Sequence, residues 1–327
     1  MTSSPSTSTE QPAEALVPGR TRPWLPWALF AATAVTTTWA WGPAFAATLL
    51  AILGAHEMGH YFVARRVGVP ATPPYFIPLP PIGGLPGTLG AVIGIGADQA
   101  DRDRLAAVAV AGPIAGFVVA LPLFVVGLLL PAELMALSGD VLFFGRSLLT
   151  GALEGALSEP APPGFDRAAH PVFFAAWVGL FVTGLNLLPI GQLDGGHLMH
   201  ALSPRHAHAV SRVCHRALLL AGGLGALGLL PFAASAAGWG GAEWVETTRP
   251  LRAWFSPVFL VWALLVGLIG LRHPPIRDEA RPLSRSGRLL VAIGALLLAL
   301  VFVPNGIWAD RYGSPESPGV TDEATSS

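Results

Sequence analysis

Seven long apolar segments recur along this 327-residue chain and constrain its fold more than any other feature. Each segment is close to the roughly 17–25 residues that an α-helix needs to cross a lipid bilayer. The composition agrees, because 52% of the residues are hydrophobic, only 12% are charged and the mean hydropathy is +0.57. The segments are residues 24–41, 43–64, 105–130, 172–190, 217–237, 255–271 and 289–308.

This pattern predicts an all-α polytopic membrane protein with six to seven transmembrane helices. The membrane domain is expected over residues 24–309, between a disordered cytoplasmic tail at residues 1–23 and a second disordered tail at residues 310–327. The first apolar segment is the least regular, because Thr36–Thr38 and the break at Gly42-Pro43 interrupt it. A re-entrant or interfacial element therefore stays open as an alternative there.

The distribution of arginine predicts the orientation of the chain in the membrane. Cytoplasmic loops carry an excess of arginine and lysine, and this chain contains no lysine. With seven alternating spans and a cytoplasmic amino terminus, fourteen of the nineteen arginines fall inside. The second span then ends in the cytoplasm at Arg65 and Arg66, so residues 56–60 lie in its cytoplasmic half.

Charge and cysteine content exclude two other classes of protein. The net charge is −1 and the basic residues form no long cluster, so we expect no nucleic-acid partner. A single cysteine, Cys214, excludes an intramolecular disulfide and a zinc site built from several cysteines. Histidine and carboxylate side chains are the metal ligands that remain.

A His-Glu-x-x-His motif, formed by His56, Glu57 and His60, lies within the second apolar segment. On a helix the two histidines project from one face and can bind a single Zn²⁺, with the glutamate placed to act as a general base. Ionisable groups are costly inside a membrane, so their presence predicts a functional site. The structural alternative is a buried helix with two hydrogen-bonded histidines.

A catalytic zinc site needs a third protein ligand and one position for water. Asp194 is the leading candidate, because it follows the fourth apolar segment at the same expected depth as His56. Pro189 interrupts that segment and Asn186 offers an amide one turn earlier, a pattern typical of a broken helix around a ligand site. The alternative is that Asp194 only caps the next helix.

The two motifs together resemble the site-2 protease family of intramembrane zinc metalloproteases. The resemblance rests on His56-Glu57-x-x-His60 in one span and Asn186-x-x-Pro189-x-x-x-x-Asp194-Gly195 in a later one. It covers roughly residues 44–200, a three-helix catalytic core, and leaves the helices of residues 209–309 without a motif. The interval between the motifs is too short for a PDZ domain, so the chain is similar to the branch of the family that lacks one.

The resemblance implies a role for each residue of the site. His56, His60 and Asp194 would bind one Zn²⁺ per chain, which lowers the pKa of a bound water from about 15.7 toward about 7. Glu57 would take a proton from that water and pass it to the leaving amine. Asn186 would hydrogen-bond the substrate or the developing oxyanion.

Three further stretches carry structural expectations. Residues 73–96 favour a small membrane-associated β-hairpin or re-entrant loop that could receive a substrate strand, with an ordinary proline-rich connector as the alternative. Residues 141–157 favour an amphipathic helix at the outer interface. Gly112 and Gly116 form a small-x-x-x-small pair, which favours close packing between helices.

The remaining histidines have weaker expectations. His197 and His200 follow Asp194 and are expected to be hydrogen-bonded interfacial residues, although a supporting role for His197 at the metal stays open. An accessory metal site in the following cytoplasmic segment is a minor alternative. Its candidate ligands are His206, His208, Cys214 and His215.

The motifs predict an intramembrane zinc metalloendopeptidase that hydrolyses peptide bonds in transmembrane segments of membrane proteins. Its expected location is a bacterial plasma membrane, with the active site toward the cytoplasm and a membrane protein as substrate. A metal-ion or proton-coupled transporter is the principal alternative, but it predicts polar groups along a whole pathway rather than at one depth. An inactive scaffold and a zinc protease with glutamate as third ligand are less favoured, because every expected ligand is present and the later spans hold no glutamate.

Overall fold

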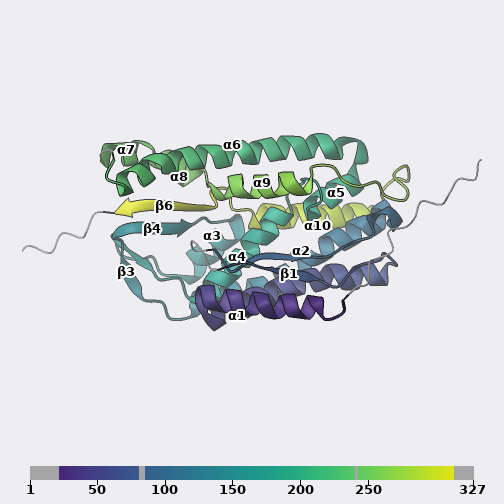
Figure 1. The fold of residues 1–327 in the computed structure, drawn as a ribbon, viewed down its shortest axis with the longest axis horizontal. Coiled ribbons are helices and arrows are strands. Elements are labelled where there is room, and N and C mark those ends of the chain that lie inside the picture. The colour runs from purple at the N-terminus through teal and green to yellow at the C-terminus, as the bar shows by residue number, and fades with distance from the viewer. Residues whose placement is uncertain (1–21, 81–84, 240–241, 313–327) are drawn as a thin grey trace, which may run out of the picture.

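The structure is a computed structural model that describes residues 22–80, 85–239 and 242–312. Its long helices lie side by side, with α6 (Pro204–Ala236) along one side of the molecule and α1 (Leu25–Arg66) along the opposite side (Figure 1). Between them lie α2 (Arg102–Leu129), α4 (Pro171–Asn186) and the short α5 (Asp194–Leu202). Of the tails expected at residues 1–23 and 310–327, residues 1–21 and 313–327 lie outside the described residues.

Among the described residues, three helices are long and apolar enough to cross a membrane by length and composition: α1, α2 and α6. The apolar helices α4 and α9 (Val258–Ile269) have 16 and 12 residues, which corresponds to about 24 Å and 18 Å of helix. Both are shorter than the roughly 30 Å hydrocarbon layer of a bilayer. The last apolar helix is α10 (Arg285–Val301), with 17 residues.

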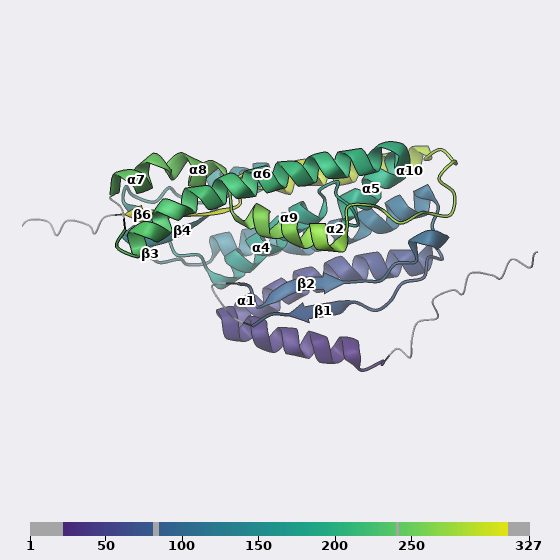
Figure 2. The same ribbon diagram turned by 45° about the horizontal axis from the view of Figure 1, so that its top comes forward.

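A bend at Gly42 divides α1 into two antiparallel halves (Figure 2). Gly42 has φ +82° and ψ 169°, a conformation that side chains other than glycine rarely adopt, and Pro43 follows it. The break expected at Gly42-Pro43 is therefore a helical hairpin, with no re-entrant coil in the first half. The second half carries the His-Glu-x-x-His motif toward its carboxyl end.

A two-stranded antiparallel sheet follows α1, formed by β1 (Tyr75–Pro78) and β2 (Thr88–Val92). It is fixed to the first half of α1, because the Thr36 hydroxyl donates to the carbonyl of Gly87 at 2.7 Å and Phe30 packs edge-on against Phe76. The prolines of this stretch prevent a continuous helix, as the sequence predicts. A 3₁₀ turn, Ala97–Gln99, leads from β2 into α2.

The interval between α2 and α4 contains less helix than the sequence suggests. The amphipathic helix expected over residues 141–157 was half wrong, because β4 (Gly139–Phe144) precedes α3 (Leu148–Leu157). β4 pairs with the distant β6 (Ile307–Tyr312), which supplies the hydrogen bonds that an isolated strand lacks. A capping box at Ser147 and Thr150 then starts α3.

Shorter strands and helices lie near the β4–β6 pair. β3 (Leu134–Ala136) pairs with β5 (Phe165–Arg167), and α7 (Ala242–Thr247) and α8 (Arg249–Trp254) follow α6. β6 continues to Tyr312, past the end expected for the membrane domain at residue 309.

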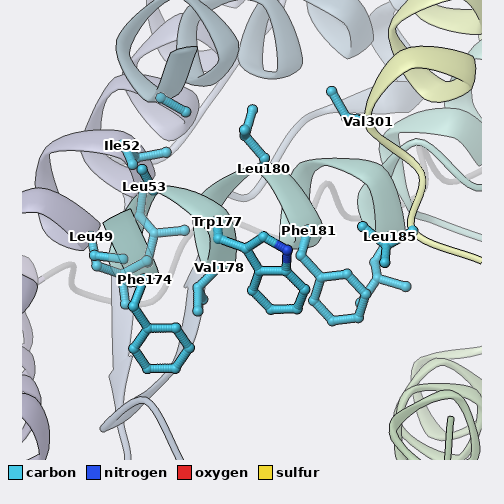
Figure 3. Close-up of a cluster of buried hydrophobic side chains, with 14 of the residues drawn as sticks. Leu49, Ile52, Leu53, Phe174, Trp177, Val178, Leu180, Phe181, Leu185 and Val301 are labelled. Carbon is cyan, nitrogen blue, oxygen red and sulfur yellow. The ribbon is translucent and has the colours of Figure 1, made fainter. Parts of the chain in front are cut away.

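The largest apolar core lies around α4 (Figure 3). Trp177, Leu180 and Phe181 are buried on this helix and pack with Leu49 and Ile52 of α1. A methyl group at Gly179 would lie 2.8 Å from the Ile52 side chain, so the two helices are in close contact. This packing brings the end of α4 to the turn of α1 that carries the motif.

Candidate metal centre and active site

His56 and His60 lie one turn apart on α1, and their rings converge because residues at i and i+4 share a helix face. The Nε2 atoms of the two rings are 3.2 Å apart. Both side chains are buried, with 4% and 3% of their surface exposed. The motif therefore forms a compact pair of candidate ligands within an apolar helix.

Asp194 approaches the two histidines from the start of α5. Helix α4 ends at Asn186, residues 187–193 form a turn, and Asp194 begins α5. Leu193, not Asp194, occupies the N-cap position of α5, and the Asp194 carboxylate oxygens lie 3.1 Å from His56 Nε2 and 3.2 Å from His60 Nε2. The helix-capping alternative is therefore not what the structure shows.

Two glycines after Asp194 make this turn possible. A methyl group at Gly195 would collide with the carbonyl oxygen of Leu187, and one at Gly196 with that of Gly191. Gly191 itself has φ +52°. The Asp-Gly-Gly sequence thus lets α5 fold back tightly onto the end of α4, which places the carboxylate opposite the histidines.

The three side chains fit a zinc ion. One ligand atom from each can be chosen so that all lie within 4.8 Å of one another. Ligand atoms at about 2.0–2.1 Å from a tetrahedral ion are separated by roughly 3.3 Å, and the two histidine Nε2 atoms are 3.2 Å apart. Each Nε2 atom also faces one oxygen of the Asp194 carboxylate, at 3.1 Å from His56 and 3.2 Å from His60. In the part of the chain that the structure describes, no other group of three histidine, cysteine or carboxylate residues meets this criterion.

Helix α2 orients the histidine rings. The Nδ1–H of His60 donates to the carbonyl oxygen of Val108 at 2.7 Å, which leaves the Nε2 lone pair free to face a metal. A methyl group at Gly112 would overlap the His60 ring, and one at Gly116 would lie 3.2 Å from His56. The small-residue pair expected to pack helices together thus packs directly against the two histidines.

Glu57 and Asn186, the two predicted catalytic residues, differ in burial. Glu57 is 6% exposed and close enough to His56, His60 and Asp194 to interact electrostatically with each. Asn186 is the half-buried last residue of α4. Neither side chain forms a hydrogen bond with any residue in the described ranges.

The accessory metal site considered for the cytoplasmic segment is not assembled. His215 Nε2 donates to the carbonyl of Ala263 at 2.9 Å, and His206 bonds to the Ser203 hydroxyl at 2.8 Å. His208 approaches the carbonyl of Leu271, and Cys214 packs against the apolar core.

The sequence did not identify two contributors to the site. The carbonyl of Val108 carries no side-chain signal, because any residue at that position offers the same oxygen. His273 contacts His197 after α9, far from either motif, and only a structure places it beside α5.

Apolar helices that gather two histidines, an aspartate and a buried glutamate at one point define the class of membrane metallopeptidases. Comparison with known proteins identifies the family. The model of peptidase family M50 matches residues 44–229, more than half of the chain. The chain therefore belongs to peptidase family M50, the site-2 protease family, as the two motifs indicate.

Curated relatives agree with this assignment. The chain is 30% identical over 251 residues to "Probable zinc metalloprotease EGY2, chloroplastic" of Arabidopsis thaliana and 34% identical over 250 residues to the EGY2 protein of Oryza sativa subsp. indica. Each match covers 76% of this chain and 39% of the relative. "Probable zinc metalloprotease EGY1, chloroplastic" of Arabidopsis thaliana is 30% identical, over 80% of this chain and 42% of its own length.

The chain thus spans about two fifths of the length of these relatives. No solved structure matches it significantly.

Proposed function

We propose that the protein is an intramembrane zinc metalloendopeptidase that hydrolyses peptide bonds in transmembrane segments of membrane proteins. The observation that carries the proposal is the triangle of His56, His60 and Asp194 ligand atoms beside the buried Glu57. Membership of peptidase family M50 and relatives named as zinc metalloproteases support it. We assign the three ligands to one zinc ion per chain.

The residue roles follow from the chemistry of the side chains. Zinc, when bound, supplies a Lewis acid that lowers the pKa of a coordinated water. Glu57 accepts the proton of the attacking water and returns it to the leaving amine. Asn186 donates its amide N–H to the substrate carbonyl, a role for which its lack of a described partner leaves it available. The carbonyl of Val108 holds the His60 ring in place throughout.

The β1–β2 sheet is the proposed binding site for the substrate. A transmembrane helix must unwind locally before its peptide bonds can be attacked, and an extended segment can pair with a strand edge. The sheet is anchored to α1, the helix that bears the histidines, and Leu89 and Val92 of β2 are half exposed. We therefore place the unwound substrate along this sheet.

The proposed topology has seven spans with the amino terminus in the cytoplasm. α1 supplies two spans because it bends at Gly42. α4 is short because it breaks at the metal-binding turn, so the residues after Asn186 cross the remaining depth. The arginine distribution puts the site near the cytoplasmic face, and a bacterial plasma membrane is the proposed location, whereas the curated relatives are named chloroplastic.

Zinc content and cleavage of a transmembrane model substrate test the proposal in one experiment on the purified full chain. Glu57→Gln should retain about one zinc per chain and lose cleavage, because the amide cannot accept the proton. Asp194→Ala should lose both cleavage and most of the zinc, because it removes a ligand. Glu243→Gln is the matched control, since Glu243 is exposed in α7, away from the site.

Two outcomes would contradict the proposal. Cleavage that persists in Glu57→Gln would remove the catalytic role of this residue. Zinc transport into vesicles by the wild type, together with no cleavage of any transmembrane substrate, would favour the transporter instead.

A further inference from the structure

A chain of hydrogen bonds joins the segment between α9 and α10 to the helix that carries Asp194. The Nδ1 atom of His197 lies 2.6 Å from Nε2 of His273, and Nδ1 of His273 lies 2.5 Å from the carbonyl oxygen of Pro274. His197 is one turn after Asp194 on α5. His273 lies outside the region that matches the peptidase family, which ends at residue 229.

The direction of these hydrogen bonds is determined by the carbonyl at one end. A carbonyl oxygen only accepts, so Nδ1 of His273 must carry the proton. Burial, with the neighbouring imidazoles His197 and His200, lowers the pKa of His273 to about 3, so its ring is neutral near pH 7. Nε2 of neutral His273 is then an acceptor, and His197 donates through Nδ1–H. The tautomer and the ring orientation of His197 are thereby fixed.

Stacking and hydrogen bonding hold His273 in place. Its ring stacks on that of His200, with centroids 4.0 Å apart and an interplanar angle of 11°. His200 Nε2 in turn lies 3.1 Å from a Glu279 carboxylate oxygen. A cavity of about 190 Å³ borders His273 and His200, so space is available for the ring to turn if these contacts are lost.

The opposite end of α5 is also attached to this segment. The Arg102 guanidinium donates to the carbonyl oxygens of Ala201 and Leu202 at the end of α5, and to that of Arg281. The α9–α10 segment thus contacts α5 at the turn after Asp194 and, through Arg102, at its carboxyl end.

We propose that His273 is a positioning residue for the metal centre: it fixes the ring of His197 and, through it, the first turn of α5 that presents Asp194. The proposal rests on the assignment of Asp194 as a metal ligand. It means that the metal centre of this protein depends on a residue outside the family's matched core. Residues that support metal ligands in this way typically change metal affinity or activity by about 10–100-fold when replaced.

Zinc affinity, measured by competition with a chromogenic chelator, tests this role without any substrate. His273→Leu should raise the zinc dissociation constant by about tenfold or more, because it leaves His197 Nδ1–H without its acceptor. His273→Gln should remain within a few fold of the wild type, since the amide oxygen can accept the same hydrogen bond. His206→Leu is the control, because His206 is exposed and its ring hydrogen-bonds to the nearby Ser203 hydroxyl.

A double substitution tests whether His273 acts through His197. His197→Leu combined with His273→Leu should weaken zinc binding no more than the stronger single change, because both remove one contact. Cleavage by His273→Leu should show a lower kcat with little change in KM, since the residue does not touch substrate. Size-exclusion profiles of the metal-free variants confirm that each one folds.

Three results would overturn the inference: unchanged zinc affinity in His273→Leu, equal impairment in His273→Gln, or additive effects in the double variant. These results are independent of proteolysis. If the wild type binds zinc but cleaves nothing, the proposed function fails while the affinity series still decides the role of His273.

Discussion

At the scale of single residues, two contacts between glycine and histidine determine how closely α2 packs against α1. Helices approach closely where a side chain is absent, and Gly112 and Gly116 supply that space opposite His60 and His56. The same approach lets the carbonyl of Val108 reach Nδ1 of His60. The orientation of the His60 ring therefore depends on how closely α1 and α2 pack.

Gly112→Ala should weaken zinc binding by tenfold or more, because the new methyl group overlaps the His60 ring and forces it or α2 to move. Cleavage should fall in proportion. Zinc titration of the purified variant measures the effect. Gly54→Ala is the control, since a methyl group there meets no atom within 4 Å. Equal zinc affinity in the two variants would show that the space at Gly112 is not needed to orient the His60 ring.

The three proposed ligands were the most predictable residues of the candidate site. His56 and His60 follow from helical spacing, and Asp194 from its place after a broken apolar segment; the structure brings all three together. The expected packing role of Gly112 and Gly116 also agrees, although their direct contact with the ligands was not foreseen. Val108 and His273 could not be predicted, because backbone oxygens and long-range contacts leave no local pattern.

At the scale of elements, the turn between α4 and α5 depends on α6. The buried Ser211 of α6 accepts a hydrogen bond from the Gly191 N–H at 2.9 Å and donates one to the carbonyl of Leu271 at 2.9 Å. One hydroxyl therefore joins the metal-binding turn, α6 and the start of the α9–α10 segment. Helices without a motif of their own thus help to hold the site.

Ser211→Ala should destabilise the protein by about 1–3 kcal/mol, because it leaves a buried N–H and a buried carbonyl without this partner. The melting temperature of the metal-free protein in detergent measures the loss. Ser286→Ala is a matched control, since Ser286 is exposed near the start of α10. A melting temperature for Ser211→Ala equal to that of the control would show that water or a neighbour replaces the hydroxyl.

The elements were predictable to the extent that they are local. Apolar length located the helices, and the prolines of residues 73–96 excluded helix where β1 and β2 form. The prediction failed at residues 141–144, because β4 is a strand only through its pairing with β6, more than 150 residues later. The short length of α4 was partly visible in Pro189, yet the helix ends three residues earlier.

At the scale of the whole molecule, the two ends of the folded structure have different roles. The candidate metal centre lies between α1, α2 and α5, whereas the last described strand, β6, pairs with β4 at the other end. Asp310 of β6 is 1% exposed and pairs with Arg252, which is fully buried, and with Arg249. Arg252 also donates to the carbonyl of Val245 at 2.7 Å, so α7, α8 and β6 are joined.

The buried pair of Arg252 and Asp310 should contribute to stability without affecting the metal centre. Asp310→Ala should cost about 3–5 kcal/mol, because it leaves the Arg252 guanidinium buried without its carboxylate. Thermal unfolding of the full chain should therefore shift to lower temperature, while zinc affinity in the surviving folded protein stays at the wild-type value.

A partner substitution separates this explanation from a general loss of packing. Arg252→Met combined with Asp310→Leu removes both charges, so it should recover part of the stability lost in Asp310→Ala. Glu246→Gln, an exposed change on α7, should leave the melting temperature unaltered. If Asp310→Ala instead lowered zinc affinity to the same degree as Gly112→Ala, the two ends would be coupled. The family core would then depend on the strand at the end of the chain as well as on the α9–α10 segment.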